Sequence, residues 1–303
     1  MEAPFRKTFI TLSLVTLAAC SPKRMAVNVV GNALASGSGG WSREDDPQLV
    51  RDATPFALKT IESLLESSPK NRGLLTAAAS GFTSYAYAFV ESDADYIEAT
   101  DHTKAKEMRA RAKKLYLRGR DYGLRGLELK NPGLRAALLK DPAGALAKTT
   151  KADVPLLYWT AASWAAAIAL DKTDAQLAAD LPVSAAMMKR VLALDEGYGE
   201  GGAYDFFISY DASLPESAGG SVVRAKQDLD RAMALCHGKR AAPLVAFAEA
   251  ASVAKQDKKE FQAILQQALA IDPNADPDNR LPNILSQQRA RWLLTRMDDL
   301  FVE

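Results

Sequence analysis

Apolar residues recur through most of the chain at intervals of three and four, the spacing that places them on one face of an α-helix. The segment from 72 to 92 is typical of this pattern. Its apolar positions are Leu75, Ala78, Ala79, Phe82, Tyr85, Ala86 and Phe89. Period-two alternation rich in β-branched residues, the mark of a strand, appears nowhere at length. The pattern therefore predicts an all-α protein.

Helix boundaries are marked by caps and prolines. Asp46 precedes Pro47, the order expected of an N-cap followed by a proline in the first turn. Asp153 stands in the same way before Val154-Pro155 and is expected to cap another helix, whereas Asn131-Pro132-Gly133 breaks one. Asp101 or Thr103 is expected to open the long helix that begins at about 104. We expect helices at 47–67, 72–92, 104–129, 134–140, 155–170, 182–194, 203–211, 219–235, 242–255, 258–271 and 281–301.

Several of these helices share an ending, which is clearest in Ala268-Leu269-Ala270-Ile271-Asp272-Pro273-Asn274. This ending resembles the close of the second helix in a tetratricopeptide (TPR) repeat, although the spacing between successive endings is irregular. Such helical pairs stack on one another. We therefore expect residues 46–303 to form degenerate TPR-like hairpins, stacked into a curved or closed α-solenoid.

The first twenty residues have the pattern of an export signal. Arg6 and Lys7 precede an uncharged segment, 8–19, that is too short to span a membrane and fits a signal peptide. Leu17-Ala18-Ala19-Cys20 resembles the lipobox of bacterial lipoproteins, and an ordinary secretory peptide with an incidental cysteine is the alternative. We expect a signal peptide at 1–19, a lipid on Cys20 and a tether at 20–45. That tether contains the flexible run Ser36-Gly37-Ser38-Gly39-Gly40 and has room for a short helix.

This N-terminus predicts a periplasmic protein held on a membrane by lipid. Ser21, where the inner-membrane retention signal has Asp, favours the outer membrane. Removal of 1–19 takes away Arg6, Lys7 and Glu2, so a chain of net charge +1 becomes formally neutral. A neutral chain gives no support to a nucleic-acid partner.

The sequence offers no catalytic or metal-binding constellation. The two histidines, His102 and His237, lie far apart and are expected at helix ends or on the surface. The two cysteines are Cys20 and Cys236, so no internal disulfide is expected and Cys236 is interpreted as a small buried side chain. The glycine-rich run 197–202 lacks the Lys-Ser/Thr of a phosphate loop and is expected to connect two helices. We therefore expect no cofactor, no metal and no enzymatic activity.

Aromatic residues beside small ones are the candidates for ligand contact. Large rings among alanines could line a cavity for an apolar ligand, or they could simply fill the core. The candidates are Tyr158, Trp159, Trp164, Tyr204, Phe207 and Tyr210.

Two pairs of adjacent aspartates are expected to have structural roles. Asp45 and Asp46 suit the start of a helix. Asp298 and Asp299 lie in a predicted last turn, so we expect them to pair with one of Arg289, Arg291 and Arg296.

Taken in order, several segments resemble the T component of tripartite ATP-independent periplasmic (TRAP) transporters. They are Leu115 to Glu128, Leu157 to Trp164, Phe206 to Tyr210 with Gly219-Gly220, Ala248-Glu249 with Gln256-Asp257, and Arg289 to Phe301. The resemblance implies a homotrimer with a pore through each protomer. It also implies a partner, the solute-binding P component, which delivers organic acids or other small hydrophobic anions to an ion-driven permease. Within the last segment, the structural or partner candidates are Arg289, Arg291, Trp292, Asp298 and Asp299.

These observations favour a lipid-anchored transport accessory that docks the P component and passes a small ligand through a pore. The alternative is a TPR-like adaptor lipoprotein for envelope assembly, which would bind cell-wall or outer-membrane machinery and no small ligand.

Overall fold

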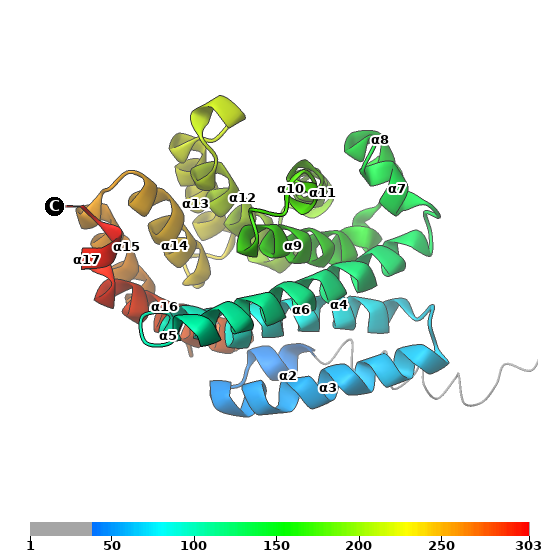
Figure 1. Cartoon of the computed structure of the whole chain (residues 1–303), viewed down its shortest axis with the longest axis horizontal. Helices are drawn as coiled ribbons and strands as arrows, with labels where there is room; N and C mark the ends of the chain where they lie inside the picture. Colours follow the sequence, from blue (N-terminus) through cyan, green and yellow to red (C-terminus); the bar gives the residue numbers. More distant parts are fainter. Residues whose placement is uncertain (1–37, 303) are drawn as a thin grey trace, which may run out of the picture.

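The computed structural model describes residues 38–302, and this part of the chain contains helices and turns but no strand (Figure 1). The all-α prediction is therefore confirmed. The predicted signal peptide, Cys20 and the tether up to residue 37 lie outside the described residues. None of the described helices combines the length and the apolar character that crossing a membrane requires.

The helix boundaries follow the predicted ones closely over most of the chain. The long elements are α3 (Pro47–Ser67), α4 (Arg72–Ala86), α6 (His102–Glu128), α9 (Val154–Leu170), α11 (Leu181–Asp195), α12 (Gly202–Ser213), α13 (Val222–Leu235), α15 (Lys258–Ala270) and α16 (Arg280–Thr295). The shorter elements are α2 (Ser38–Ser42), α5 (Ser92–Ile97), α7 (Leu134–Leu138), α8 (Pro142–Leu146), α10 (Ala175–Ala178), α14 (Ala242–Phe247) and α17 (Met297–Leu300).

Several predicted caps are present. The Asp46 carboxylate accepts hydrogen bonds from the backbone N–H groups of Gln48 and Leu49, at 2.9 Å and 3.1 Å. Asp101 accepts from Lys104 in the same way, at 2.9 Å. Asp153 is the residue before α9, at the predicted position, but its side chain makes no capping hydrogen bond to that helix. It accepts from the Thr150 N–H at 2.8 Å and from Arg72 at 2.6 Å, which ties α9 to the start of α4.

Two predicted helices are interrupted by π-helical turns, and this corrects the sequence analysis. The first is η1 (Tyr87–Glu91), which follows α4 and leads into α5. The second is η5 (Ala248–Ser252), which follows α14. A π-turn shifts the register by one residue and redirects the side chains after it. Each of these two turns carries a glutamate, Glu91 in η1 and Glu249 in η5.

Smaller differences have local causes. The last predicted helix, 281–301, is broken at Arg296, which lies between α16 and α17. Part of the run expected to be flexible, Ser36–Gly40, lies in α2, whose contacts with α16 outweigh the low helix propensity of glycine. The turn-rich stretch after Lys140 contains the short helix α8. Before α11, the chain forms α10, which the sequence analysis did not predict.

Helix α6 lies between α4 and α9, and glycines allow these helices to approach closely. A Cβ atom on Gly123 would overlap Thr160 Oγ1 and would lie 3.1 Å from Thr160 Cβ. One on Gly126 would lie 2.8 Å from the Leu156 methyl groups, and one on Gly119 would lie 2.9 Å from Thr83 Oγ1. The small residues of α6 therefore set the distance to α9 on one side and to α4 on the other.

The buried apolar side chains form two cores joined by shared helices. The first core is built mainly from α3, α4, α6, α9 and α11, and the second from α13, α14, α15 and α16. Helix α12 contributes Phe207 to the first core and Ile208 to the second. Helix α16 contributes Leu281 to the first and Leu293 to the second.

The two ends of the helical array meet. Helix α16 contacts both α2 and α3, and the turn before it, η6 (Pro277–Asn279), also contacts α2. Arg43 donates to Asp278 at 2.6 Å, and Arg280 donates to the Arg43 carbonyl at 3.1 Å. The C-terminal helices therefore close the chain back onto its first described helices.

Candidate functional site

Two of the predicted aromatic residues, Tyr158 and Trp159, lie together on α9. Their ring centroids are 5.1 Å apart, and Tyr198 of the η3 turn (Tyr198–Glu200) lies 5.3 Å from Tyr158. A Cβ atom on Gly202 would lie 3.0 Å from the Tyr158 hydroxyl, so the glycine admits this ring. Burial raises the pKa of the Tyr158 hydroxyl, and the carboxylate of Asp205 raises it further.

The other four aromatic candidates lie elsewhere. Trp164 is 2% exposed and belongs to the core. The Tyr204 hydroxyl donates to Glu196 at 2.6 Å, and Arg231 holds the same carboxylate at 2.8 Å and 2.7 Å. Arg231 and Tyr204 together lower the Glu196 pKa to about 2. The structure therefore does not gather the six candidates into one site.

Phe207 and Tyr210 line a groove of about 510 Å³ beside α13. The Tyr210 ring stacks on Phe206 with centroids 5.5 Å apart. Lys189 and Asp228 border the same groove. Burial, together with the negative charge of Asp211, raises the Asp228 pKa to about 6.

The C-terminal candidates have distinct surroundings. The Arg289 side chain is 13% exposed and forms ion pairs, whereas Arg291 is exposed. The expected partner of Asp299 is confirmed, because Arg296 lies 3.0 Å from its carboxylate. The expectation for Asp298 was wrong. This side chain is 99% exposed and pairs with Lys258 at 3.2 Å, since the break at Arg296 turns α17 toward the start of α15.

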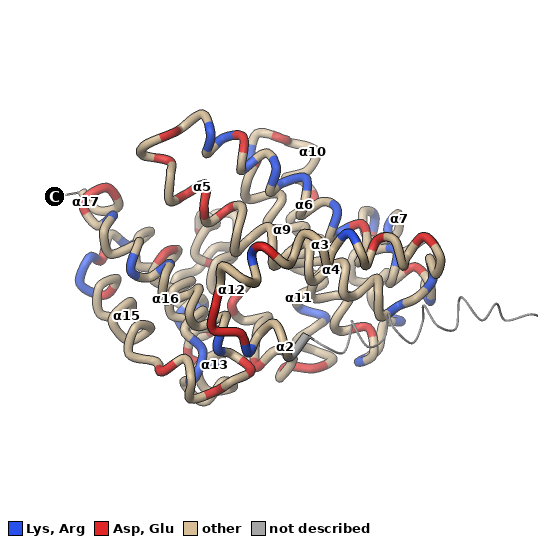
Figure 2. Tube along the Cα trace, turned by 90° about the horizontal axis from the view of Figure 1, so that it is seen from below, with Lys and Arg blue, Asp and Glu red and all other residues tan. Residues whose placement is uncertain are grey.

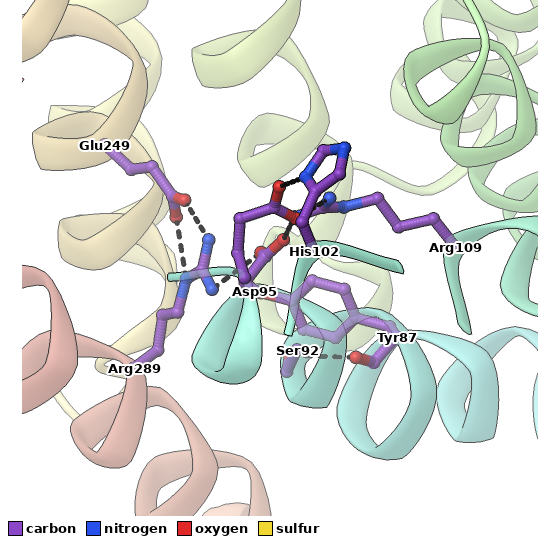
Figure 3. A network of polar contacts seen from close by, with 8 residues as sticks. Tyr87, Ser92, Asp95, His102, Arg109, Glu249 and Arg289 are labelled. Atoms are coloured by element: carbon purple, nitrogen blue, oxygen red, sulfur yellow. Dashed lines mark hydrogen bonds and ion pairs between the residues drawn. The ribbon is translucent and has the colours of Figure 1, made fainter. Parts of the chain in front are cut away.

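Arg289 is the centre of an ion-pair network that joins α16 to η5 and to α5 (Figure 3). Its guanidinium binds Glu249 of η5 and lies 2.8 Å from Asp95 of α5. Arg109 of α6 donates to the other Asp95 oxygen at 2.8 Å and also binds Glu98. The Arg289 guanidinium lies 4.3 Å from the Trp292 ring centroid, which in turn lies 5.4 Å from Tyr96. We call Arg289, Asp95, Glu249 and Arg109 the Arg289 network.

Tyr87 lies beside this network, and the sequence analysis missed it. Its side chain is 57% exposed, yet burial raises the pKa of its hydroxyl, and Glu249 raises it further. The exposure and the raised pKa are both consistent with a ring that protein surrounds on several sides and that solvent reaches on another. Helix α4 packs against α3, α6 and α9, and its remaining side is exposed at Ser84 and, in the η1 turn that follows, at Tyr87. We call this side, with Glu91 of η1, the Tyr87 face.

Glu91 is a partly buried carboxyl on the Tyr87 face, and it has an unusual pKa. Burial raises this pKa from 4.5 to about 7, although the Tyr116 hydroxyl donates to the carboxylate and opposes the rise. Asp95 and Glu249 also raise it, whereas Arg289 lowers it. The group therefore changes its charge near neutral pH.

This titration predicts a pH-dependent stability. The folded chain binds the Glu91 proton more tightly than the unfolded chain, so its stabilising effect is complete below pH 4.5 and is lost as the pH rises through about 7. We expect the free energy of unfolding of the parent protein to fall by about 1 to 2 kcal/mol across this pH window. The Glu91→Gln variant, which has no carboxyl group at this position, should not show this fall. Urea unfolding of both proteins at several pH values measures the difference. Parallel curves for the two proteins would contradict the prediction.

Three further predictions concern Cys236, the two histidines and the glycine-rich run 197–202. Cys236 is 1% exposed, which confirms its interpretation as a buried side chain. His102 starts α6 and His237 follows α13, and both are exposed, as expected. The glycine-rich run connects α11 to α12, with Gly199 and Gly201 at positive φ. Across residues 38–302, no three His, Cys, Asp or Glu side chains are arranged to hold a metal ion.

The described residues, 38–302, therefore form an all-helical protein whose helices are joined by ion pairs such as those of Arg289. A family model described as TRAP transporter T-component matches residues 43–301, nearly the whole described part. The chain belongs to this family and is thus an accessory component of a TRAP transporter, a membrane-associated transport system. A protein of Treponema pallidum (strain Nichols), described as uncharacterized, is 32% identical over 313 residues, which cover 97% of each chain.

Proposed function

We propose that the chain is a lipid-anchored scaffold that docks the periplasmic solute-binding P component and passes it a small hydrophobic or organic-acid ligand. The family match over residues 43–301 is the observation that carries this proposal. The scaffold consists of degenerate TPR-like hairpins, works as a homotrimer, and is held at a membrane, in preference the outer one, by a lipid on Cys20. It performs no bond-making of its own.

The Tyr87 face supports the ligand part of the proposal. Helix α16 contacts α2 and α3, and α3 packs against α4. In the η1 turn after α4, Tyr87 presents a solvent-reached aromatic ring next to the charges of Arg289 and Glu249. A ligand with an apolar body and a carboxylate would find an aromatic surface and a guanidinium together. Tyr158, beside Asp205 and Arg240, repeats this combination on α9.

Affinity capture from cells tests the docking part. The lipidated chain, tagged at its C-terminus, is isolated from detergent-solubilised envelopes of its own organism, and co-purifying proteins are identified by mass spectrometry. We expect a TRAP solute-binding subunit as a stoichiometric partner, because the family couples this component to that transporter. The Lys172→Ala variant, changed at an exposed residue outside the partner candidates, serves as the tag and folding control.

A capture that brings down cell-wall or outer-membrane assembly proteins, with no solute-binding subunit, would favour the alternative of an envelope adaptor. That outcome would refute the docking proposal while leaving the family assignment untouched.

A further inference from the structure

A continuous basic stripe runs along the exposed side of α6. Between residues 111 and 125, the exposed positions of this helix are Arg111, Lys114, Arg118 and Arg125. Spacings of three, four and seven place them on one helix face. Figure 2 shows Lys and Arg recurring along α6. We call these four residues the basic ridge.

Aromatic rings hold three of the four cations in place. The guanidinium of Arg111 lies 5.7 Å from the Tyr85 ring centroid, that of Arg118 lies 5.0 Å from Phe82, and that of Arg125 lies 5.1 Å from Tyr122. The Phe82 and Tyr122 rings are themselves stacked, with centroids 5.9 Å apart. Leu117 and Tyr122, with Lys114, Arg118 and Arg125, line a groove of about 460 Å³ at this face. The charges are therefore displayed on a fixed, partly apolar surface.

Two carboxylates border the ridge, and of the four ridge cations Arg118 alone forms an ion pair with one of them within the described residues. Glu62 binds Arg118, and Lys59 lies 2.8 Å from it. Asp121 lies 3.0 Å from Arg120 and 3.3 Å from Arg135. In the described part of the chain, no carboxylate forms an ion pair with Arg111, Lys114 or Arg125. The ridge therefore carries positive charge that the fold itself does not use.

Helix α3, which borders the ridge through the Glu62–Arg118 ion pair, carries an exposed aromatic side chain. Phe56 of α3 is 79% exposed, and Leu49, two turns earlier on the same side, is 55% exposed. Phe56 lies one turn before Lys59. Lys59 forms an ion pair with Glu62, and Glu62 also binds Arg118 of the ridge. Protein surfaces that lie in a membrane interface combine exposed apolar side chains with Lys and Arg.

We propose that the basic ridge and Phe56 form a contact surface for an anionic phospholipid bilayer. The cations bind the phosphate groups, and Phe56 enters the headgroup layer. The contact rests on the membrane location in the proposed function, since a lipid on Cys20 would keep the domain beside such a surface. It orients the scaffold with α3 and α6 toward the lipid, and it needs neither the P component nor a transported ligand.

Vesicle sedimentation tests the proposal without any transporter partner. The chain from residue 20 onward, carrying Cys20→Ser, has no acyl chain and keeps every residue that the structure describes. It is mixed with phosphatidylcholine vesicles that contain or lack phosphatidylglycerol. The test variant is Arg111→Gln/Lys114→Gln/Arg125→Gln, which leaves the Arg118–Glu62 pair intact. The matched control is Lys172→Gln/Lys239→Gln/Lys259→Gln, which removes three exposed cations elsewhere.

We expect binding to the phosphatidylglycerol vesicles to fall about 100-fold in the test variant, because each cation near an anionic membrane contributes about five-fold. The control should change by less than about five-fold, and salt should weaken binding by the parent chain. Equal binding of the parent to both vesicle types would overturn the proposal, and so would test and control variants that behave alike. A test variant that keeps vesicle binding but loses the solute-binding subunit would assign the ridge to an acidic protein instead.

Discussion

Replacing Gly123 by alanine is expected to destabilise the fold by about 2 to 3 kcal/mol. The added Cβ would overlap Thr160 Oγ1 and approach the Thr160 Cα to 3.4 Å, at a point where α6 and α9 are in close contact. Thr160 is fully buried and its hydroxyl donates to the Leu156 carbonyl at 2.5 Å, so it has little room to move. The better helix propensity of alanine, about 1 kcal/mol, offsets only part of this strain.

Chemical unfolding monitored by circular dichroism measures the effect. Gly40→Ala is the matched control, because a Cβ there meets nothing within 4 Å. The double variant Gly123→Ala/Thr160→Ala removes the overlapping hydroxyl and should recover at least about 1 kcal/mol. A Gly123→Ala protein as stable as the parent would show that α6 and α9 do not approach as described.

The Arg289→Met substitution is expected to cost about 3 kcal/mol. Methionine keeps the apolar stem against Trp292 but removes the charge that Glu249 and Asp95 share. Breaking a buried pair leaves a carboxylate without its partner, and Glu249 is 38% exposed, so solvent compensates part of the loss. Arg109 still holds Asp95, which leaves Glu249 as the main unpaired group.

A double-mutant cycle with Glu249→Gln isolates the interaction. The two changes together should cost less than their sum by at least about 1 kcal/mol. Arg291→Met, at an exposed position on the same helix, should change stability by no more than about 0.5 kcal/mol. Strict additivity of Arg289→Met and Glu249→Gln would mean that the network does not join η5 to α16.

The sequence predicted local features of the fold well. Asp46, Asp101 and Asn131-Pro132 set helix boundaries through backbone hydrogen bonds and the geometry of proline, which act within a few residues. The burial of Cys236 was predicted from its small apolar side chain, which had no disulfide partner. Such signals depend on neighbours in the chain, so they can be read without knowing the tertiary structure.

The site could not be predicted in the same way, because its parts come from distant segments. Arg289 was a candidate, but its partners Asp95 and Glu249 are far from it in sequence and meet it only because α16 closes onto the N-terminal helices. Tyr87 has the periodicity of an ordinary helix, and nothing local distinguishes it from a core residue. The π-turns that place Glu91 and Glu249 arise from packing rather than from local propensity.

The basic ridge illustrates an intermediate case. The spacing of Arg111, Lys114, Arg118 and Arg125 can be read from the sequence, but an ordinary solvated helix face shows similar charges. Within the described residues, Arg111, Lys114 and Arg125 form no ion pair with a carboxylate, and this becomes visible only in three dimensions. The same holds for the stacking of Arg111, Arg118 and Arg125 on Tyr85, Phe82 and Tyr122.

Direct binding of a solute-binding subunit tests the proposed function most directly. The purified chain from residue 20 onward is mixed with the TRAP solute-binding protein of the same organism and measured by native mass spectrometry, with and without solute. The account predicts a trimer of this chain that carries the solute-binding subunit. Two separate proteins under every solute condition, with no mixed complex at concentrations well above those in the periplasm, would contradict it.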